Sequence, residues 1–177
     1  MAALNIVSVT VSVTTLDNHL ARIMEPRTSS PAKRLDTIDV LSKNGIRTGV
    51  LVAPIIPGLT DEEIPSILKA AASSSAQYAG YTMLRLPYAI KDLFQDWLQK
   101  SIPERAPKIL SRIRDVRGGK LNDSTFGKRM KGEGQVAEAI KQLFQVSHKK
   151  YFGGSPRFTL ASSHFRRLSH NQLLMFS

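Results

Sequence analysis

The chain has 177 residues, 42% hydrophobic content and a formal net charge of +11 at pH 7, which suits one globular domain and excludes a disordered or fibrous chain. It contains no cysteine, so it provides by itself neither a disulfide nor a thiolate ligand for a metal. No apolar run approaches the roughly 20 residues that cross a bilayer, and the N-terminus lacks a secretion-signal pattern, so we expect a cytoplasmic protein without membrane contact.

The first 86 residues alternate between strand and helix patterns. In residues 5–15, valines alternate with serine and threonine, the strongest strand pattern in the chain. A helix is predicted next, because Ser30 and Pro31 suit its N-cap and first position. Thr60 and Glu63 then match the capping-box spacing that opens a second helix. The predicted elements are a strand at 5–15, a helix at 32–44, a strand at 46–53, a helix at 60–73 and a strand at 78–86.

This order of elements predicts an α/β fold. Helical crossovers of more than a dozen residues join the strands, as in consecutive right-handed βαβ units of a parallel sheet. Three strands make an incomplete sheet, because a parallel sheet needs both faces covered or a closed barrel. Since the first strand begins almost at Met1, we expect a sheet cut at its N-terminal edge, with a missing half-barrel chain as partner. A bare edge of this kind also favours self-association.

Helix patterns dominate beyond the third strand, with amphipathic segments at 90–100, 106–116 and 135–146. We therefore divide the chain into an α/β segment at 1–98 and a helical C-terminal extension at 99–177. The first segment carries nine basic and nine acidic side chains, whereas the extension carries 16 and 5, so it holds all of the excess positive charge. A basic region attracts polyanions, which makes nucleic acid a candidate partner, with a solvated basic surface as the alternative.

Candidate binding residues follow the predicted strands, since ligands of parallel α/β sheets bind at the carboxyl ends of the strands. Ser12, Thr14 and Thr15 end the first strand with hydroxyl groups. The second strand leads into the loop 54–58 (PIIPG), which either presents a stiff apolar surface to a flat ligand or is a rigid turn. Arg85 lies at the end of the third strand. Together these residues predict a pocket with a polar rim.

Five separated motifs resemble the radical SAM superfamily, in the branch related to spore photoproduct lyase. The resemblance runs from Ile6 to about Phe144, and the final QLLMF at 172–176 resembles the usual chain end of that branch. It implies a partial (βα)6 barrel in which these three strands correspond to the fourth, fifth and sixth. The motifs are VSVTTLD, MEPRTSSPAKRL, VLVAPIIPGLTDEE, YAGYTMLRLP and RGGKLNDSTFGKRMKGEGQVAEAI.

The resemblance also implies which residues bind S-adenosylmethionine. Polar residues at the end of the fourth barrel strand meet the ribose or methionine part, and the loops after the fifth and sixth strands surround the adenine. Glu25 and Arg85 correspond to polar residues that face the mouth of the barrel, without an assigned role, and no catalytic residue is identified. The implied cofactor contacts are Ser12, Thr14, Ile55, Ile56, Pro57, Gly58, Leu86 and Pro87.

The chain departs from the family in the cluster-binding region. The CxxxCxxC loop, which holds three irons of a [4Fe-4S] cluster while S-adenosylmethionine binds the fourth, is absent together with every cysteine. The Gly-rich segment after the second barrel strand is also missing. The scattered histidines His19, His148, His164 and His170 do not replace the thiolates, so we expect no metal site in this chain.

Two functions of different classes follow. In the first, the chain is the C-terminal part of a radical SAM enzyme that forms a 5′-deoxyadenosyl radical, and it is inactive alone. In the second, it is a non-enzymatic basic module that binds nucleic acid. For the second we expect phosphate contacts from side chains clustered near glycines, unless these merely solubilise the domain or pair with local carboxylates. They are Lys120, Lys128, Arg129 and Lys131.

Overall fold

The centre of the fold is a sheet of three parallel strands. The structure is a computed structural model that describes residues 2–154 and 159–163. The strands β1 (Ser8–Val13), β2 (Arg47–Ile55) and β3 (Tyr78–Met83) lie in the order β1-β2-β3. The predicted α/β fold with a parallel sheet is therefore confirmed. Closure of these strands into a barrel with other strands stays a prediction.

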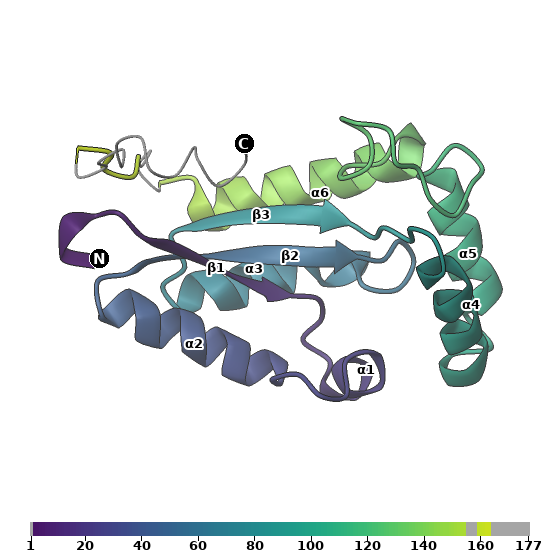
Figure 1. The fold of residues 1–177 in the computed structure, drawn as a ribbon, viewed down its shortest axis with the longest axis horizontal. Helices are drawn as coiled ribbons and strands as arrows, with labels where there is room; N and C mark the ends of the chain where they lie inside the picture. The colour runs from purple at the N-terminus through teal and green to yellow at the C-terminus, as the bar shows by residue number, and fades with distance from the viewer. Residues whose placement is uncertain (1, 155–158, 164–177) are drawn as a thin grey trace, which may run out of the picture.

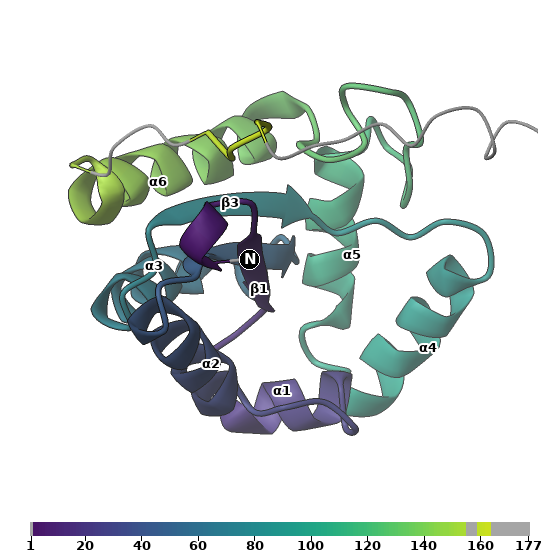
Figure 2. The same cartoon turned by 60° about the vertical axis from the view of Figure 1, so that its left-hand side comes forward.

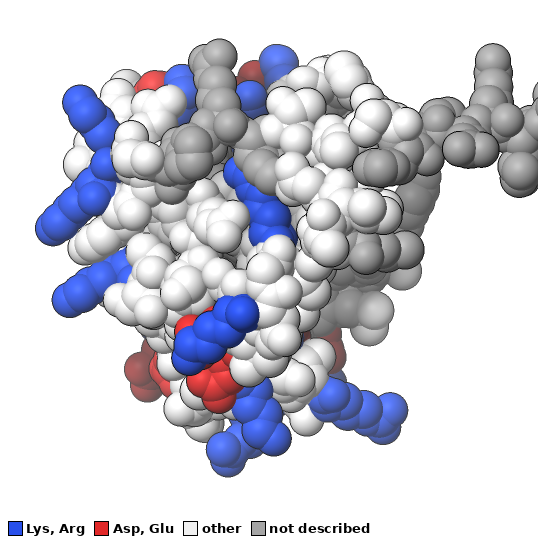
Figure 3. Space-filling view, turned by 90° about the vertical axis from the view of Figure 1, so that its left-hand side faces the viewer, with Lys and Arg blue, Asp and Glu red and all other residues white. Residues whose placement is uncertain are grey.

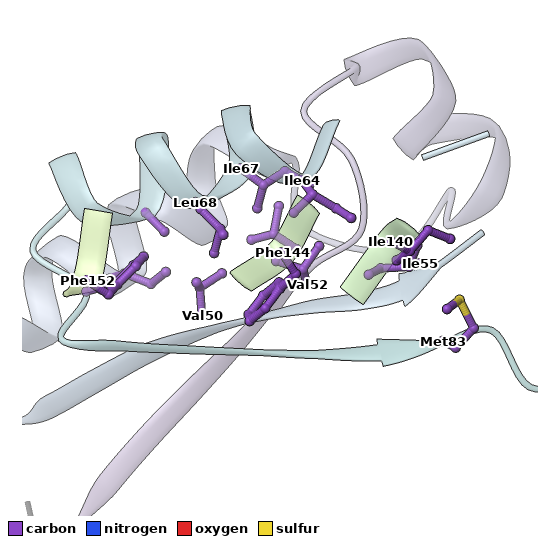
Figure 4. Packing of buried hydrophobic residues seen from close by; sticks show 14 of the residues in the cluster. Val50, Val52, Ile55, Ile64, Ile67, Leu68, Met83, Ile140, Phe144 and Phe152 are labelled. Atoms are coloured by element: carbon purple, nitrogen blue, oxygen red, sulfur yellow. The ribbon is translucent and has the colours of Figure 1, made fainter. Parts of the chain in front are cut away.

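Three helices cover one face of this sheet. They are α2 (Pro31–Lys43), α3 (Ile64–Ser73) and α6 (Gly134–Phe152), and Figure 1 shows them along the strands. Apolar side chains of α3 and α6 meet those of β2 over the centre of the sheet, as in the group of Ile67, Phe144 and Val52 (Figure 4). Burial of these side chains, each contributing about 1.5–3 kcal/mol, fixes which face of each strand points inward.

A second core lies at the carboxyl ends of the strands. The helices α1 (Asn18–Met24), α4 (Ile90–Ser101) and α5 (Ala106–Asp115) supply most of it, and Figure 2 shows α2, α1, α4 and α5 following one another in an arc beside the sheet. The indole Nε1–H of Trp97 in α4 donates to the carbonyl oxygen of Ile23 in α1 at 3.0 Å. Helices far apart in sequence are thus joined next to the strand ends.

The other face of the sheet, which we call the open face, is polar at β1. Ser8, Thr10 and Ser12 are exposed and alternate with side chains that face the helices. At the beginning of the strands, the open face is covered by the Tyr78 ring, which lies over Gly49. The Tyr78 hydroxyl is hydrogen-bonded to the hydroxyls of Ser8 and Thr10 at 2.7 Å and donates to the Val9 carbonyl at 2.9 Å.

Several predicted boundaries need correction. The first strand is shorter than predicted, because 3-10 helix η1 (Ala2–Leu4) and a turn precede it, and the last helix is longer, ending at Phe152. Helix α1 was not predicted. The second strand does not end before the proline-rich loop: β2 continues through Pro54 to Ile55, with an irregular register between Val52 and Ile55.

The predicted capping box is wrong. The Thr60 side chain makes no cap to the helix and instead accepts a hydrogen bond from the Ile56 amide at 2.9 Å. The Glu63 carboxylate turns to the end of β1. Between them lies the 3-10 helix η2 (Asp61–Glu63), which joins directly to α3. Thr60 therefore closes the loop after β2, and Glu63 connects that loop to the end of β1.

The boundary between the two predicted segments falls inside α4. Helix α6 shares a core with the sheet, and α5 shares the second core with the loop after β2, so the segments are packed together. Within the described residues, no helix has the length and apolar character needed to cross a bilayer.

Candidate functional site

The carboxyl end of β1 is organised by the guanidinium of Arg34, which projects from α2. Its Nη1 donates to the Ser12 carbonyl at 3.0 Å, and its Nε donates to the Ser29 carbonyl at 3.1 Å. Its Nη2 contacts the Glu25 carboxylate at 2.5 Å, and the Arg34 side chain is only 17% exposed. Charge-assisted bonds of this kind are among the stronger protein hydrogen bonds. Arg34 thus fixes the loop 25–30 against the end of β1.

A second carboxylate joins the end of β1 to the start of α3. Glu63 accepts hydrogen bonds from the Thr15 hydroxyl at 2.5 Å and from the Leu16 amide at 2.7 Å. The neighbouring Thr14 hydroxyl donates to the carbonyl of Ala53 in β2 at 2.9 Å. Both threonines are buried. The Thr14 hydroxyl joins the ends of β1 and β2, and the Thr15 hydroxyl joins the end of β1 to the segment before α3.

Hollows of different size adjoin this cluster. A small cavity of about 10 Å³ is lined by Thr14, Thr15, Glu25 and Arg34 together with residues of α1 and the following loop. Beside it, a wider depression of about 390 Å³ runs along Val11 and Ser12 toward Arg34 and Thr37. The wider hollow is large enough for part of a small organic ligand. Ser12 is the predicted cofactor residue that lines it.

The loop after β2 is packed more tightly than the sequence suggested. Ile55 and Ile56 are both fully buried, Ile55 in the core between sheet and helices and Ile56 in the core at the strand ends. Pro57 is buried, and Gly58 is half-buried with a positive φ of 80° that suits glycine. The Gly58 amide donates to the Asp61 carboxylate at 2.8 Å. The loop therefore presents mainly backbone to a ligand, and its contact with adenine stays a prediction.

The segment after β3 also carries predicted residues. Leu86 is buried, and its amide donates to the Asn122 side chain at 3.1 Å, whereas Pro87 is half-buried. Arg85 is exposed and lies near a second arginine, Arg117, that the sequence did not single out. Thus, of the predicted cofactor residues, Ser12, Gly58 and Pro87 retain accessible surface at the strand ends.

Arg117 is buried. Its Nη2 donates to the Leu84 carbonyl at 2.5 Å, its Nη1 donates to the Lys128 carbonyl at 3.2 Å, and its Nε has no hydrogen-bond partner within the described residues. Burial lowers the pKa of Arg117, the Asp123 carboxylate opposes this effect, and Arg85 adds to it. Arg117 therefore links the end of β3 to the long loop between α5 and α6.

The basic loop, residues 117–133, holds all four predicted phosphate contacts. Lys128 pairs with Glu133 at 2.6 Å, which raises the pKa of Lys128, and the Arg129 guanidinium lies 5.4 Å from the centre of the Phe126 ring. Lys120 and Lys131 are exposed, with no ion pair to the described part of the chain. The structure thus brings the four residues onto one loop, one of them in an ion pair.

The basic loop lies at the end of the molecule toward which the strands point (Figure 1). The Met83 amide donates to the Met130 carbonyl at 2.9 Å, so the loop continues beside the end of β3. Figure 3 faces the opposite end, where the basic side chains stand in separate groups.

No metal-binding cluster of three or more His, Cys, Asp or Glu residues occurs in the described part of the chain. Among the histidines, His148 packs against the rings of Phe144 and Phe152. His164, His170 and the resemblance at 172–176 lie outside the described residues.

A comparison with known families finds a match in the N-terminal part of the chain. Residues 1–71 match the sequence model of the Radical SAM superfamily. This region contains β1, β2, the Arg34 cluster and most of α3. A likeness to the superfamily is therefore found over the residues of the Arg34 cluster and the loop after β2, while the spore photoproduct lyase branch is not distinguished.

The matching curated proteins have no described function. The uncharacterized protein Rv2578c of Mycobacterium tuberculosis is 33% identical over 112 residues, which cover 62% of this chain and 32% of that protein. The uncharacterized protein ORF301 of Acidianus two-tailed virus is 43% identical over 47 residues, which cover 27% and 16%. The chain thus spans about a third or less of these relatives. No solved structure matches.

Proposed function

We propose that this chain forms the C-terminal part of a radical SAM barrel of the branch related to spore photoproduct lyase. In this proposal, β1, β2 and β3 are the last three barrel strands, and their carboxyl ends form one wall of the S-adenosylmethionine site. The observation that carries the proposal is the coincidence of the Radical SAM match at 1–71 with a polar strand-end cluster on a parallel sheet. The activity of the whole protein would be reductive cleavage of S-adenosylmethionine to a 5′-deoxyadenosyl radical.

The residues present do not fit an iron–sulfur cluster. Radical SAM clusters are held by thiolates, and the chain has no cysteine. In the proposal these ligands come from a preceding half-barrel, encoded with this segment or by a partner chain. The hydroxyl groups of Ser8, Thr10 and Ser12 suit the interior of such a barrel, because they lie on the open face, where Ser8 and Thr10 bond to the Tyr78 hydroxyl and Ser12 is exposed.

Anaerobic reconstitution tests the first part of this proposal. After incubation with iron and sulfide, the chain is expected to show no cluster absorption, and no 5′-deoxyadenosine after addition of dithionite and S-adenosylmethionine. A stoichiometric [4Fe-4S] band would contradict it. Reading the DNA upstream of the Met1 codon for a frame that encodes CxxxCxxC tests the second part, since such a frame would identify the missing half.

A second candidate function is nucleic-acid binding by the C-terminal part. It is favoured by the excess of basic side chains at 99–177 and by the gathering of Lys120, Lys128, Arg129 and Lys131 on one loop. If all four contact phosphates, affinity for duplex DNA falls with salt with a logarithmic slope of about −0.9 per contact. A salt titration of the wild type and of a variant with all four residues changed to alanine measures this. Equal binding by both proteins would refute the assignment.

A further inference from the structure

The basic loop carries an aromatic side chain that the protein core does not use. Phe126 is 87% exposed, whereas the aromatic residues of the strands and helices are buried or half-buried. The Met130 side chain of the same loop is 41% exposed. Leaving a phenyl ring in water forfeits the hydrophobic stabilisation that burial of the ring would give. Two exposed apolar side chains therefore lie on a loop rich in basic side chains.

One cation lies against this ring, and further basic side chains lie on the same loop. Arg129 lies over its face at 5.4 Å from the centroid, and residues 117–133 contain five basic and two acidic side chains. Both acids are engaged: Asp123 accepts a hydrogen bond from the Thr125 amide at 2.9 Å, and Glu133 pairs with Lys128. The loop therefore offers one flat apolar face amid net positive charge.

Hydrogen bonds attach the basic loop to the segment after β3. The buried Arg117 donates hydrogen bonds to Leu84, directly after β3, and to Lys128 in the loop. The Asn122 side chain accepts a hydrogen bond from the Leu86 amide. These contacts fix Asn122 and Lys128, which lie on either side of the exposed Phe126. Because these contacts already order the loop, the loop loses little conformational entropy when a ligand binds to the exposed ring.

We propose that the basic loop binds single-stranded nucleic acid, with one base stacked on Phe126 and the neighbouring phosphates held by Lys120, Arg129 and Lys131. Base stacking on aromatic side chains combined with Lys and Arg contacts to phosphates is the usual mode for single strands. A duplex hides its base faces, and a membrane surface needs a larger apolar face than one ring and one methionine. This inference rests on the second proposed function and adds the class of nucleic acid and the base contact.

The test uses fluorescence anisotropy with a labelled short oligothymidylate and with an abasic strand of the same length. Wild type is expected to bind oligothymidylate at low salt and to bind the abasic strand at least about five-fold more weakly, the lower limit for one stacked base. Phe126→Ala should weaken binding of oligothymidylate by the same factor and leave binding of the abasic strand unchanged. Tyr88→Ala is the matched control, because Tyr88 is 95% exposed outside the loop, and it should change neither affinity.

The phosphate contacts are tested separately. The double variant Lys120→Ala/Lys131→Ala should weaken binding of both strands equally and reduce the salt slope by about 0.7 per lost contact. Circular dichroism checks that each variant is folded. If Phe126→Ala binds oligothymidylate like wild type, the stacking proposal is wrong even when the lysine variant confirms phosphate binding. If neither strand binds at low salt, both proposals fail, and Phe126-dependent sedimentation with phosphatidylserine vesicles would assign the loop to membranes instead.

Discussion

At the scale of single residues, Arg117 shows how one buried side chain connects two distant segments. Its guanidinium satisfies the carbonyls of Leu84 and Lys128 while being almost fully buried. Arg117→Met fills the space but removes both donors, so the two carbonyls lose their partners. We expect the free energy of unfolding to fall by about 2–4 kcal/mol, measured by urea denaturation.

Arg114 provides the control, because it is exposed in the last turn of α5, three residues before Arg117. Arg114→Met should change the free energy of unfolding by no more than about 0.5 kcal/mol. Equal urea midpoints for the two variants would show that the bonds of Arg117 do not contribute to stability.

Tyr81 gives a second prediction at this scale. Its ring packs against Phe144 at 4.7 Å, and burial raises the pKa of Tyr81, with Lys141 opposing and Glu138 adding to this effect. The folded state therefore holds the phenolic proton more tightly than the unfolded state. This stabilisation is complete below the unfolded pKa of about 10 and is lost as pH rises through the higher folded value.

Unfolding measured by urea at a series of alkaline pH values checks this. Tyr81→Phe cannot ionise, so its free energy of unfolding should fall less steeply than that of wild type above about pH 10. Parallel curves for the two proteins would contradict the assignment.

At the scale of secondary-structure elements, the strands are coupled across the open face by Gly49 and Tyr78. An added Cβ at Gly49 would lie 2.3 Å from the Tyr78 ring, and that ring is held by its hydroxyl bonds and by the Arg47 guanidinium at 4.9 Å from its centroid. Gly49→Ala should therefore destabilise the protein by about 1–3 kcal/mol.

A double-mutant cycle isolates this contact. In a Tyr78→Ala background, Gly49→Ala should have much less effect, because the ring is gone. Gly80→Ala is a matched strand control, since its added Cβ would approach only the end of the flexible Leu51 side chain, at 3.3 Å. If Gly49→Ala costs the same in both backgrounds, the ring is not the obstacle.

The sequence predicted the elements better than their contacts. Alternation of valine with hydroxyl residues located β1, and the helix signals at Ser30 and Pro31 located α2, because these patterns are local. Helix α1 was missed because it has only seven residues, although Asp17 does cap it. Local patterns do not reveal which partner a side chain selects, as with Glu63, which bonds to the residues just after β1 instead of capping its own helix.

The candidate site was predicted by position along the chain and less well by exposure. The residues do gather at the strand ends, as parallel topology requires. Ile56 is nevertheless buried, because α4 and α5 pack over it, and packing between segments so far apart is not encoded in a short motif. The Glu25–Arg34 pair likewise depends on the path of the intervening loop.

At the scale of the whole molecule, β1 leaves one edge of the sheet without a strand partner in the described residues. Unpaired strand edges favour association with other chains. We expect the purified protein to self-associate with increasing concentration, as measured by light scattering. Ser12→Lys, at an exposed position of β1, should reduce association by placing a charge there. A monodisperse wild-type monomer at all concentrations would count against the half-barrel proposal.

Trp97 lies where α1 meets α4 and can serve as a fluorescence donor at a fixed place in the molecule. It is the only tryptophan, and the chain has no cysteine, so Ser124→Cys would accept one thiol-reactive dye on the exposed part of the basic loop. Resonance energy transfer from Trp97 to that dye would report how far the loop stands from the helices at the strand ends. A change in transfer efficiency when an oligonucleotide is added would then show, in real time, that the loop moves relative to the candidate site.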